Sequence, residues 1–345
     1  MAEVVHIDPS ADPRWTAFVE EHPRAMVFHH PAWMAALQDT YGYEQCSLLC
    51  VDGQQVFGVL PLLGIASRLT GKRGVCLPFS DYGYPLFSRA AGLDALLAAC
   101  QDLKERRGWA YIELRGMTLH PSAKPSARYK VHRLDLTPGP EALFKGFTRG
   151  GTQAAIKQCE KFGVRIERRT DPEAVAIFRR LNYQTRKKHG IPPQPDRFFD
   201  AIHKHLIARG MGFVSLATEQ GRPIAASVFL TYRGTLYHKF NASDESLLRF
   251  RPNHGILWDA IQWGCANGQH TLDMGRSDLD GEGLLKYKRS WGTIESDLTY
   301  VRFTEQQTEI RSGEGGALHL INPVLRHTPV PVLKLLGNFL YEHVA

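Results

Sequence analysis

The spacing of apolar and polar residues in the first half of the chain predicts alternating helices and strands. The predicted elements are a helix, a β-hairpin, a second helix and a strand, at residues 31–42, 46–64, 90–108 and 109–116. The hairpin prediction depends on Asp52-Gly53, a two-residue turn signal between two apolar runs. Gly42 and Gly108 end the helical patterns, as glycine often does at the C-terminal end of a helix.

The second half contains a similar series of elements. Helices are predicted at residues 171–190, 195–210 and 254–268, three strands within 212–243, and a further strand at 270–277. Asp171 is a suitable N-cap for the first of these helices, and Gly190 follows its basic last turn. The three strands are separated by turns at Gln220-Gly221 and Arg233-Gly234.

The two halves can be superimposed along the sequence, which indicates a duplication. The turn residues Gly53 and Gly221 are 168 residues apart, and the helix-ending Gly108 and Gly268 are 160 apart. At 345 residues the chain also exceeds the usual size of one hydrophobic core. We therefore expect an α/β (α+β) protein with two tandem domains, each a mixed, mostly antiparallel sheet flanked by helices. The expected parts are domains at 1–135 and 136–305 and a tail with a short amphipathic helix at 306–345.

Composition narrows the class of protein. The chain is 43% hydrophobic and 22% charged, which is ordinary for a soluble globular protein. No apolar run is long enough for a transmembrane helix, and the N-terminus does not have the pattern of a secretory signal. The six cysteines lack metal-binding spacing, so we expect reduced thiols, no metal site and a cytoplasmic location.

The charge distribution points to one segment. The net charge is +7, and residues 141–189 contain twelve Lys and Arg but only five Asp and Glu, an excess equal to that of the whole chain. This segment therefore predicts either an anionic partner or a solvated basic face.

Two charged stretches suggest binding chemistry. Residues 249–258, "RFRPNHGILW", place Arg249 and Arg251 before a helix start, with Asn253 as the expected N-cap and free backbone N–H groups beyond it. Near the end of the chain, an acidic loop is followed by "GLLKYKRSWG" at 283–292, predicted as a basic turn. Trp291 is expected in the core, and Gly292 at a tight bend. The acidic loop lacks the last ligand of a calcium-binding loop, which argues against a metal.

Several segments together resemble one family. The order of elements, with "GRPIAASVFL", "FNASDESLLRFRPNHGILWDAI", "LDMGRS" and "GLLKYKRSWG", is similar to the FemAB/FemX-type group of the GNAT acyltransferases, in which two GNAT-like domains are fused. "LPFSDYGYPLF" at 77–87 resembles its first-domain motif, and the resemblance extends from about residue 33 to 291. Three differences stand out: the tight glycine-rich pyrophosphate loop is absent, an inserted helical arm is absent, and Tyr287-Lys288 replaces Phe-Lys.

The resemblance implies roles for particular residues. Lys288 matches the lysine implicated in stabilising the transition state, and Tyr287 beside it is the second catalytic candidate, at the aromatic position of the same motif. Lys286 and Arg289 are expected to contact phosphates, as a compact charge and a planar fork. The remaining donor-binding candidates lie at the helix start and are Arg249, Arg251, Asn253 and Gly255. The acceptor-binding candidates are Asp81, Tyr82, Arg276 and Asp278, with a simple Asx-type turn as the alternative for Asp81-Tyr82.

The resemblance also implies the substrates. The best-known members move amino acids from aminoacyl-tRNA to peptidoglycan precursors, and others are linked to exopolysaccharide systems. We therefore expect an acyltransferase that uses an acyl-CoA-type thioester or an aminoacyl-tRNA and has no permanently bound cofactor. Its acceptor would be an amine or hydroxyl of a cell-envelope or exopolysaccharide precursor. The alternative is a non-catalytic pair of GNAT-like domains that binds RNA or a phosphorylated glycan through its basic face. The sequence leaves the oligomeric state open.

Overall fold

A computed structural model describes residues 3–116, 124–304, 311–312 and 323–343. The chain divides into two compact units. Unit 1 consists of Met1–Tyr129, Leu298–Ser312 and Asn338–Ala345, and unit 2 of Lys130–Asp297 and Gly313–Gly337. Two boundaries between them fall inside long strands, β9 (Lys124–Asp135) and β15 (Ile294–Phe303).

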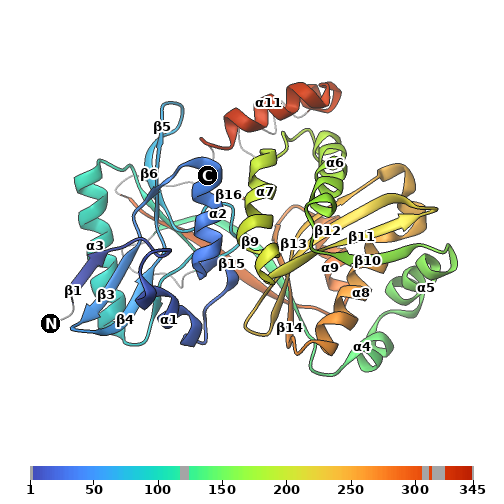
Figure 1. Cartoon of the computed structure of the whole chain (residues 1–345), viewed down its shortest axis with the longest axis horizontal. Coiled ribbons are helices and arrows are strands. Elements are labelled where there is room, and N and C mark those ends of the chain that lie inside the picture. The colour runs from blue at the N-terminus through green and yellow to red at the C-terminus, as the bar shows by residue number, and fades with distance from the viewer. Residues whose placement is uncertain (1–2, 117–123, 305–310, 313–322, 344–345) are drawn as a thin grey trace. The chain divides into compact units, whose positions relative to one another are not determined.

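The described residues of unit 1 include two groups of paired strands and the α-helices α1, α2 and α3 (Figure 1). One sheet has the strand order β1-β3-β4-β7, and in the other group β15, β8, β6, β5 and β2 follow one another. The predicted helices, hairpin and strand of the first half are all present. The elements are α1 (Pro13–Glu21), α2 (Pro31–Tyr41), α3 (Ala90–Arg107), β1 (Glu3–His6), β2 (Glu44–Gln45), β3 (Leu48–Asp52), β4 (Gln55–Leu60), β5 (Leu63–Ser67), β6 (Gly71–Val75), β7 (Leu86–Phe87), β8 (Ile112–Arg115) and β16 (Arg311–Ser312).

A buried charge cluster lies at β8 of unit 1. The Glu113 carboxylate accepts hydrogen bonds from Arg115 Nε at 3.1 Å and from Arg302 Nε and Nη2 at 3.0 and 2.8 Å. Arg115 also donates to the carbonyl oxygens of Leu77 and Ser80. The two guanidinium groups favour the charged carboxylate, so the pKa of Glu113 is lowered although its burial acts in the opposite direction.

Unit 2 contains one run of strands in the order β10-β11-β12-β13-β14-β9. Asp171 caps α6 through the backbone N–H of Ala174, as predicted, and Gly190 ends that helix in the left-handed conformation. The elements are α4 (Pro140–Gly146), α5 (Ala154–Lys161), α6 (Pro172–His189), α7 (Asp196–His205), α8 (Pro252–Ala266), α9 (Glu282–Arg289), α11 (Val330–Leu340), β10 (Arg165–Arg169), β11 (Gly212–Glu219), β12 (Arg222–Tyr232), β13 (Thr235–Ser243) and β14 (Thr271–Asp278).

Two layers of helices cover the strands of unit 2. On one side, Phe240 of β13 contacts aromatic rings of α6 and α7, including Phe178 and Phe199. On the other side, Phe229 of β12 belongs to a core cluster with Ile256 and Ile261 of α8. Figure 1 shows α6 and α7 on one side of these strands and α8 on the other.

The charged stretch near the end of unit 2 differs from its predicted form. Residues 282–289 are a helix, α9, and not a basic turn, with Leu285 and Lys288 buried and Lys286 and Arg289 exposed. Helical geometry therefore distributes the three cations over different sides. Trp291 is fully buried and Gly292 has a φ of 70°, as the sequence predicted.

The C-terminal helix α11 packs closely on a turn of unit 2. Leu333 is completely buried, and Lys334 Nζ donates to Asp196 Oδ2 at 2.8 Å. A Cβ atom on Gly337 would lie 2.0 Å from the carbonyl oxygen of Pro193, so only glycine fits at this contact.

We expect Gly337→Ala to lower the free energy of unfolding by about 1–3 kcal/mol, because the methyl group would push α11 off the Pro193 carbonyl. Urea denaturation followed by circular dichroism would measure the loss. Asn338→Ala is the control, since the neighbouring Asn338 is exposed. Equal stability of the two variants would contradict the contact.

Candidate active site

The parallel strands β13 and β14 separate partway along their length. They pair at Thr235–Thr271, Leu236–Leu272 and Tyr237–Asp273, and no further pairs follow although both strands continue. Ligands of open α/β sheets usually bind where neighbouring strands part at their carboxyl ends. This position is therefore the natural place to look for a reaction centre in unit 2.

Where β14 no longer pairs with β13, side chains form hydrogen bonds with the backbone groups of β14 instead. Asp273 is buried; its Oδ1 accepts from the backbone N–H of Gly275 at 2.8 Å and its Oδ2 from Arg133 at 3.0 Å. Gly275 has a φ of 65°, in the left-handed region that favours glycine. Lys288 Nζ donates to the carbonyl oxygens of Gly275 and Arg276 at 2.9 and 3.1 Å. Since Lys288 is 5% exposed, its ammonium is a fixed, largely desolvated charge at the parting of the strands.

A β-bulge on β13 lies beside this point. Val228 pairs with Phe240 while the next residue, Phe229, pairs with His238, so Lys239 is the additional residue. The bulge lets Phe240 face α6 and α7, whereas His238 stacks on Phe229 on the side of α8. The pKa of His238 is lowered to about 3. Burial is the main cause, and the positive charge of Lys288 is the second. His238 follows the last residue of β13 that pairs with β14, and Lys288 Nζ binds carbonyls of β14 just beyond that pair, so both groups lie where the strands part.

A cavity of about 480 Å³ lies beside α9, on a different side of this helix from Lys288. It is lined by the segment before α5, the start of α8 and one face of α9. The lining residues are Gly150, Gly151, Thr152, Ala154, Ala155, Gln158, Arg251, His254, Gly283, Lys286, Tyr287 and Ser290. Two cations, two adjacent glycines and three hydroxyl groups make this lining suitable for an anionic ligand.

Two predicted donor-binding residues, Arg251 and Lys286, line this cavity together with the catalytic candidate Tyr287. Lys286 is exposed, and Arg251 holds Gln158 Oε1 through Nε at 3.0 Å. Tyr287 is enclosed between His254 and Trp291, and burial raises the pKa of its phenol well above the usual value. Tyr287 therefore stays protonated at neutral pH. It faces the cavity, whereas Lys288 faces β14, so the structure does not bring this predicted pair to one point.

One expectation for the start of α8 was wrong. Asn253 is not the N-cap: α8 begins at Pro252, and its N-cap is Arg251, with a φ of 57° and no side-chain cap. Gly255, another donor-binding candidate, lies inside the helix and is not among the residues that line the cavity. A Cβ on Gly255 would lie 2.5 Å from Cys159 Sγ, so its role is the close approach of α5 and α8.

The other predicted site residues are dispersed. Arg249 lies over the Phe250 ring and donates to Ser246, and Arg289 is ion-paired with Glu295 at 2.7 Å, so neither lines the cavity. Arg276 and Asp278 share one face of β14 beyond the point where it leaves β13. Asp81 and Tyr82 belong to unit 1, where Tyr82 is 3% exposed and packs near Phe28.

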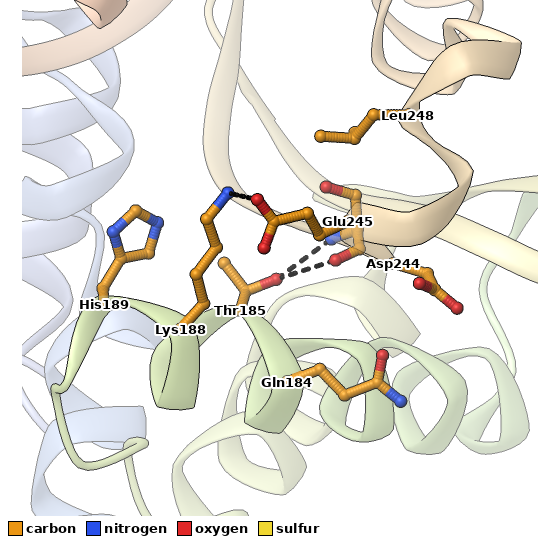
Figure 2. A pocket seen from close by; sticks show the side chains of 8 residues that line it. Gln184, Thr185, Lys188, His189, Asp244, Glu245 and Leu248 are labelled. Carbon is orange, nitrogen blue, oxygen red and sulfur yellow. Dashed lines mark hydrogen bonds and ion pairs between the residues drawn. The ribbon is translucent and has the colours of Figure 1, made fainter. Parts of the chain in front are cut away.

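A second cavity, of about 250 Å³, lies between the end of α6 and the end of β13 (Figure 2). Lys188 meets Glu245 there at 2.5 Å, and Thr185 Oγ1 exchanges hydrogen bonds with the backbone of Ser243. The polar groups of this cavity therefore form ion pairs and hydrogen bonds with one another. The basic segment shows the same tendency: within the described residues, its cations form the ion pairs Arg168–Asp259, Arg169–Asp171, Arg179–Asp200 and Lys188–Glu245.

Within the described residues, no group of three or more His, Cys, Asp or Glu side chains is placed to hold a metal ion. None of the helices in residues 3–116, 124–304 and 323–343 combines the length and apolar character that a bilayer crossing requires.

Sequence reasoning missed the Gly150-Gly151 wall of the larger cavity. The signal was present in "TRGGTQAAIKQ", a glycine pair directly before an apolar-periodic stretch. Gln158 and Ser290 had no such signal, because only the packing of α5 and α9 brings them to the cavity.

Comparison with known proteins identifies the fold. Residues 146–289 match the family model described as an acetyltransferase (GNAT) domain, which supports acyl transfer as the class of reaction. The sequence matches no curated protein.

Solved structures extend the match over most of the chain. FemX has a TM-score of 0.68 at 16% identity, covering 88% of this chain and 97% of FemX. The tandem GNAT protein from the clavulanic acid biosynthesis pathway has a TM-score of 0.55 at 13% identity, with 90% and 100% covered. L-PGS from Bacillus licheniformis has a TM-score of 0.56 at 12% identity, with 96% and 98% covered. The predicted α/β class with tandem GNAT-like domains is confirmed.

Proposed function

Because the chain carries a GNAT acetyltransferase domain within a FemX-like tandem fold, we propose that it transfers an acyl or aminoacyl group from an activated donor to an amine or hydroxyl. The observation that carries this proposal is the buried ammonium of Lys288 at the parting of β13 and β14. Acyl transfer develops negative charge on the carbonyl oxygen, and a fixed cation in a low-dielectric site stabilises that charge strongly.

The proposed step is a nucleophilic substitution at the acyl carbon. The acceptor nitrogen or oxygen attacks the carbonyl carbon, and the π-electron pair of the C=O bond moves onto oxygen. When the tetrahedral intermediate collapses, the C=O bond re-forms and the C–S bond of a thioester or the C–O bond of an aminoacyl ester breaks. The leaving thiolate or alkoxide takes up the proton that the nucleophile loses. Lys288 is proposed to stabilise the intermediate.

The larger cavity is the proposed site for the phosphate-bearing part of the donor. Arg251 and Lys286, which both line the cavity, supply positive charge. Both candidate donors, an acyl-CoA-type thioester and an aminoacyl-tRNA, carry phosphates. Since both are made in the cytoplasm, the proposed reaction takes place there. The proposed acceptor is an amine or hydroxyl of a cell-envelope or exopolysaccharide precursor.

We expect Arg251→Gln with Lys286→Gln to weaken donor binding about tenfold or more while kcat changes little, because these cations contact phosphates and not the reacting carbonyl. Steady-state assays with acetyl-CoA and with alanyl-tRNA would measure the change in KM. Arg249→Gln is the matched control, since Arg249 lies on Phe250 outside the cavity. If the control raised KM as much as the double variant, the cavity would not be the donor site.

Salt dependence and native ligands separate the two donors. Binding of tRNA should weaken steeply as salt rises, because many phosphate contacts release counterions, whereas a CoA thioester should respond weakly. Mass spectrometry of ligands that copurify with the protein would identify a CoA ester directly. Binding without turnover of any donor would favour the non-catalytic alternative.

A further inference from the structure

We propose that His238 is a second donor to the oxyanion, presenting its Nδ1–H beside the ammonium of Lys288. This inference rests on the proposed acyl transfer and adds a catalytic residue to it. His238 lies on β13 directly after Tyr237, the last residue that pairs with β14, and thus at the point where the strands part.

The His238 ring is held in one orientation. It stacks on Phe229 with ring centroids 4.8 Å apart and an interplanar angle of 18°, and its Nε2 lies 3.1 Å from Ser227 Oγ. Phe229 and Ser227 are themselves buried on β12. A group positioned by a strand scaffold in this way needs little reorganisation when charge develops in front of it.

The surroundings of Ser227 determine the tautomer of this ring. Within the described part of the chain, the His238 ring is the one hydrogen-bond partner of Ser227 Oγ, and Ser227 is 1% exposed. If Nε2 carried the proton and donated to Oγ, the serine hydroxyl proton would be buried without an acceptor, which is costly. Ser227 therefore donates to Nε2, and the neutral ring carries its proton on Nδ1.

The ring stays neutral at physiological pH. Burial, and then the charge of Lys288, lower the pKa of His238 to about 3. A neutral imidazole with a proton on one nitrogen can act only as a donor at that nitrogen. No hydrogen bond to Nδ1 is found within the described residues, and the side chain keeps partial exposure, unlike the buried Tyr237 before it.

Two neighbouring donors, one charged and one neutral, favour an anion. As the nucleophile attacks, the electron pair of the C=O bond moves onto oxygen; the Nδ1–H of His238 and the ammonium of Lys288 would then face that oxygen. Neither group gives up its proton, and both bonds weaken when the C=O bond re-forms and the leaving group departs. A neutral imidazole is suited to this role because it donates without adding a second positive charge beside Lys288.

Two isosteric substitutions separate catalysis from structure. In His238→Asn the amide nitrogen can occupy the place of Nδ1, whereas in His238→Gln it reaches only the place of Nε2. We expect His238→Gln to lower the single-turnover rate about a hundredfold with little change in KM, and His238→Asn to retain much of the rate. The assay would use acetyl-CoA and alanyl-tRNA as donor probes and hydroxylamine as the amine acceptor. Nitrogen-15 NMR of the histidine-labelled wild-type protein would report the tautomer independently.

The outcomes are distinguishable. A wild-type protein that transfers, with a protonated Nδ1 and His238→Asn more active than His238→Gln, would support the inference. A protonated Nε2, equal losses in both variants or a fully active His238→Gln would overturn it and leave the acyl transfer intact. A wild-type protein that transfers from neither donor would overturn the proposed function and the catalytic role of His238 together. Circular dichroism of each variant would exclude loss of fold as the cause.

Discussion

Lys288→Met is expected to lower the rate of acyl transfer about a thousandfold while donor binding changes little. Methionine keeps the length and the apolar stem of the buried side chain but removes the charge. The loss follows from the role of a preorganised cation at a developing oxyanion, where removal of one donor typically costs a hundred- to a thousandfold. Single-turnover kinetics with saturating donor would measure the effect.

The contrast with Lys286 makes the Lys288 experiment specific. Lys286 lies two residues earlier on α9, but it is exposed and lines the cavity, whereas Lys288 is buried against β14. Lys286→Met should therefore raise KM and spare kcat, the reverse of the Lys288 result. Lys288 also donates hydrogen bonds to the carbonyl oxygens of Gly275 and Arg276, so its replacement can lower stability as well as activity. The stability of each variant is therefore measured by urea denaturation. A stable Lys288→Met protein with the wild-type rate would contradict the mechanism.

The fold was largely predictable because periodicity and turn chemistry act locally. Asp171 and Gly190 mark the two ends of α6, and Asp52-Gly53 marks the β3–β4 hairpin, without reference to distant residues. α9 was missed because its apolar pattern is weak: Leu284 is exposed, and Tyr287 is only partly buried, between the core and the cavity. Its buried face is completed by a lysine, which a pattern of apolar residues does not reveal.

The candidate site was predictable in its motifs but not in its geometry. The sequence placed Lys286, Tyr287, Lys288 and Arg289 in one cluster, yet helical geometry directs neighbouring members to different partners. Arg289 meets Glu295, a residue of β15. The position of His238 depends on a bulge at Lys239 and on Ser227 in the adjacent strand. Such cross-strand relations arise only when the chain is folded.

These contacts give α9 two separate tasks in the proposed reaction. One side of the helix, through Lys286 and Tyr287, forms the wall of the anion-binding cavity. Another side, through Lys288, binds the carbonyl oxygens of Gly275 and Arg276 near the end of β14 and would supply the charge for the reacting carbonyl. The proposed donor would therefore extend past α9, with its phosphates at the cavity and its acyl group toward the parting of the strands.

Glu113→Gln is expected to lower the free energy of unfolding by about 3–5 kcal/mol, the largest effect on stability that we predict. Glutamine keeps the shape of the side chain but leaves the Arg115 and Arg302 guanidinium groups without their buried counter-charge. Urea denaturation would measure the loss. Glu44→Gln is the matched control in the same unit: its ion pair with Arg107 at 2.8 Å is largely exposed, and we expect a change below about 1 kcal/mol.

The same substitution should also alter the response of stability to acid. The pKa of Glu113 is lowered in the folded protein, so its contribution is fully present above the ordinary glutamate value of about 4.3. As the pH falls below that value and through the folded pKa, the carboxylate takes up a proton and the contribution is lost. Wild-type stability should therefore fall more steeply with acid than that of Glu113→Gln, and the two curves should converge. Parallel curves between pH 7 and pH 3 would show that Glu113 is not the charge that balances the two arginines.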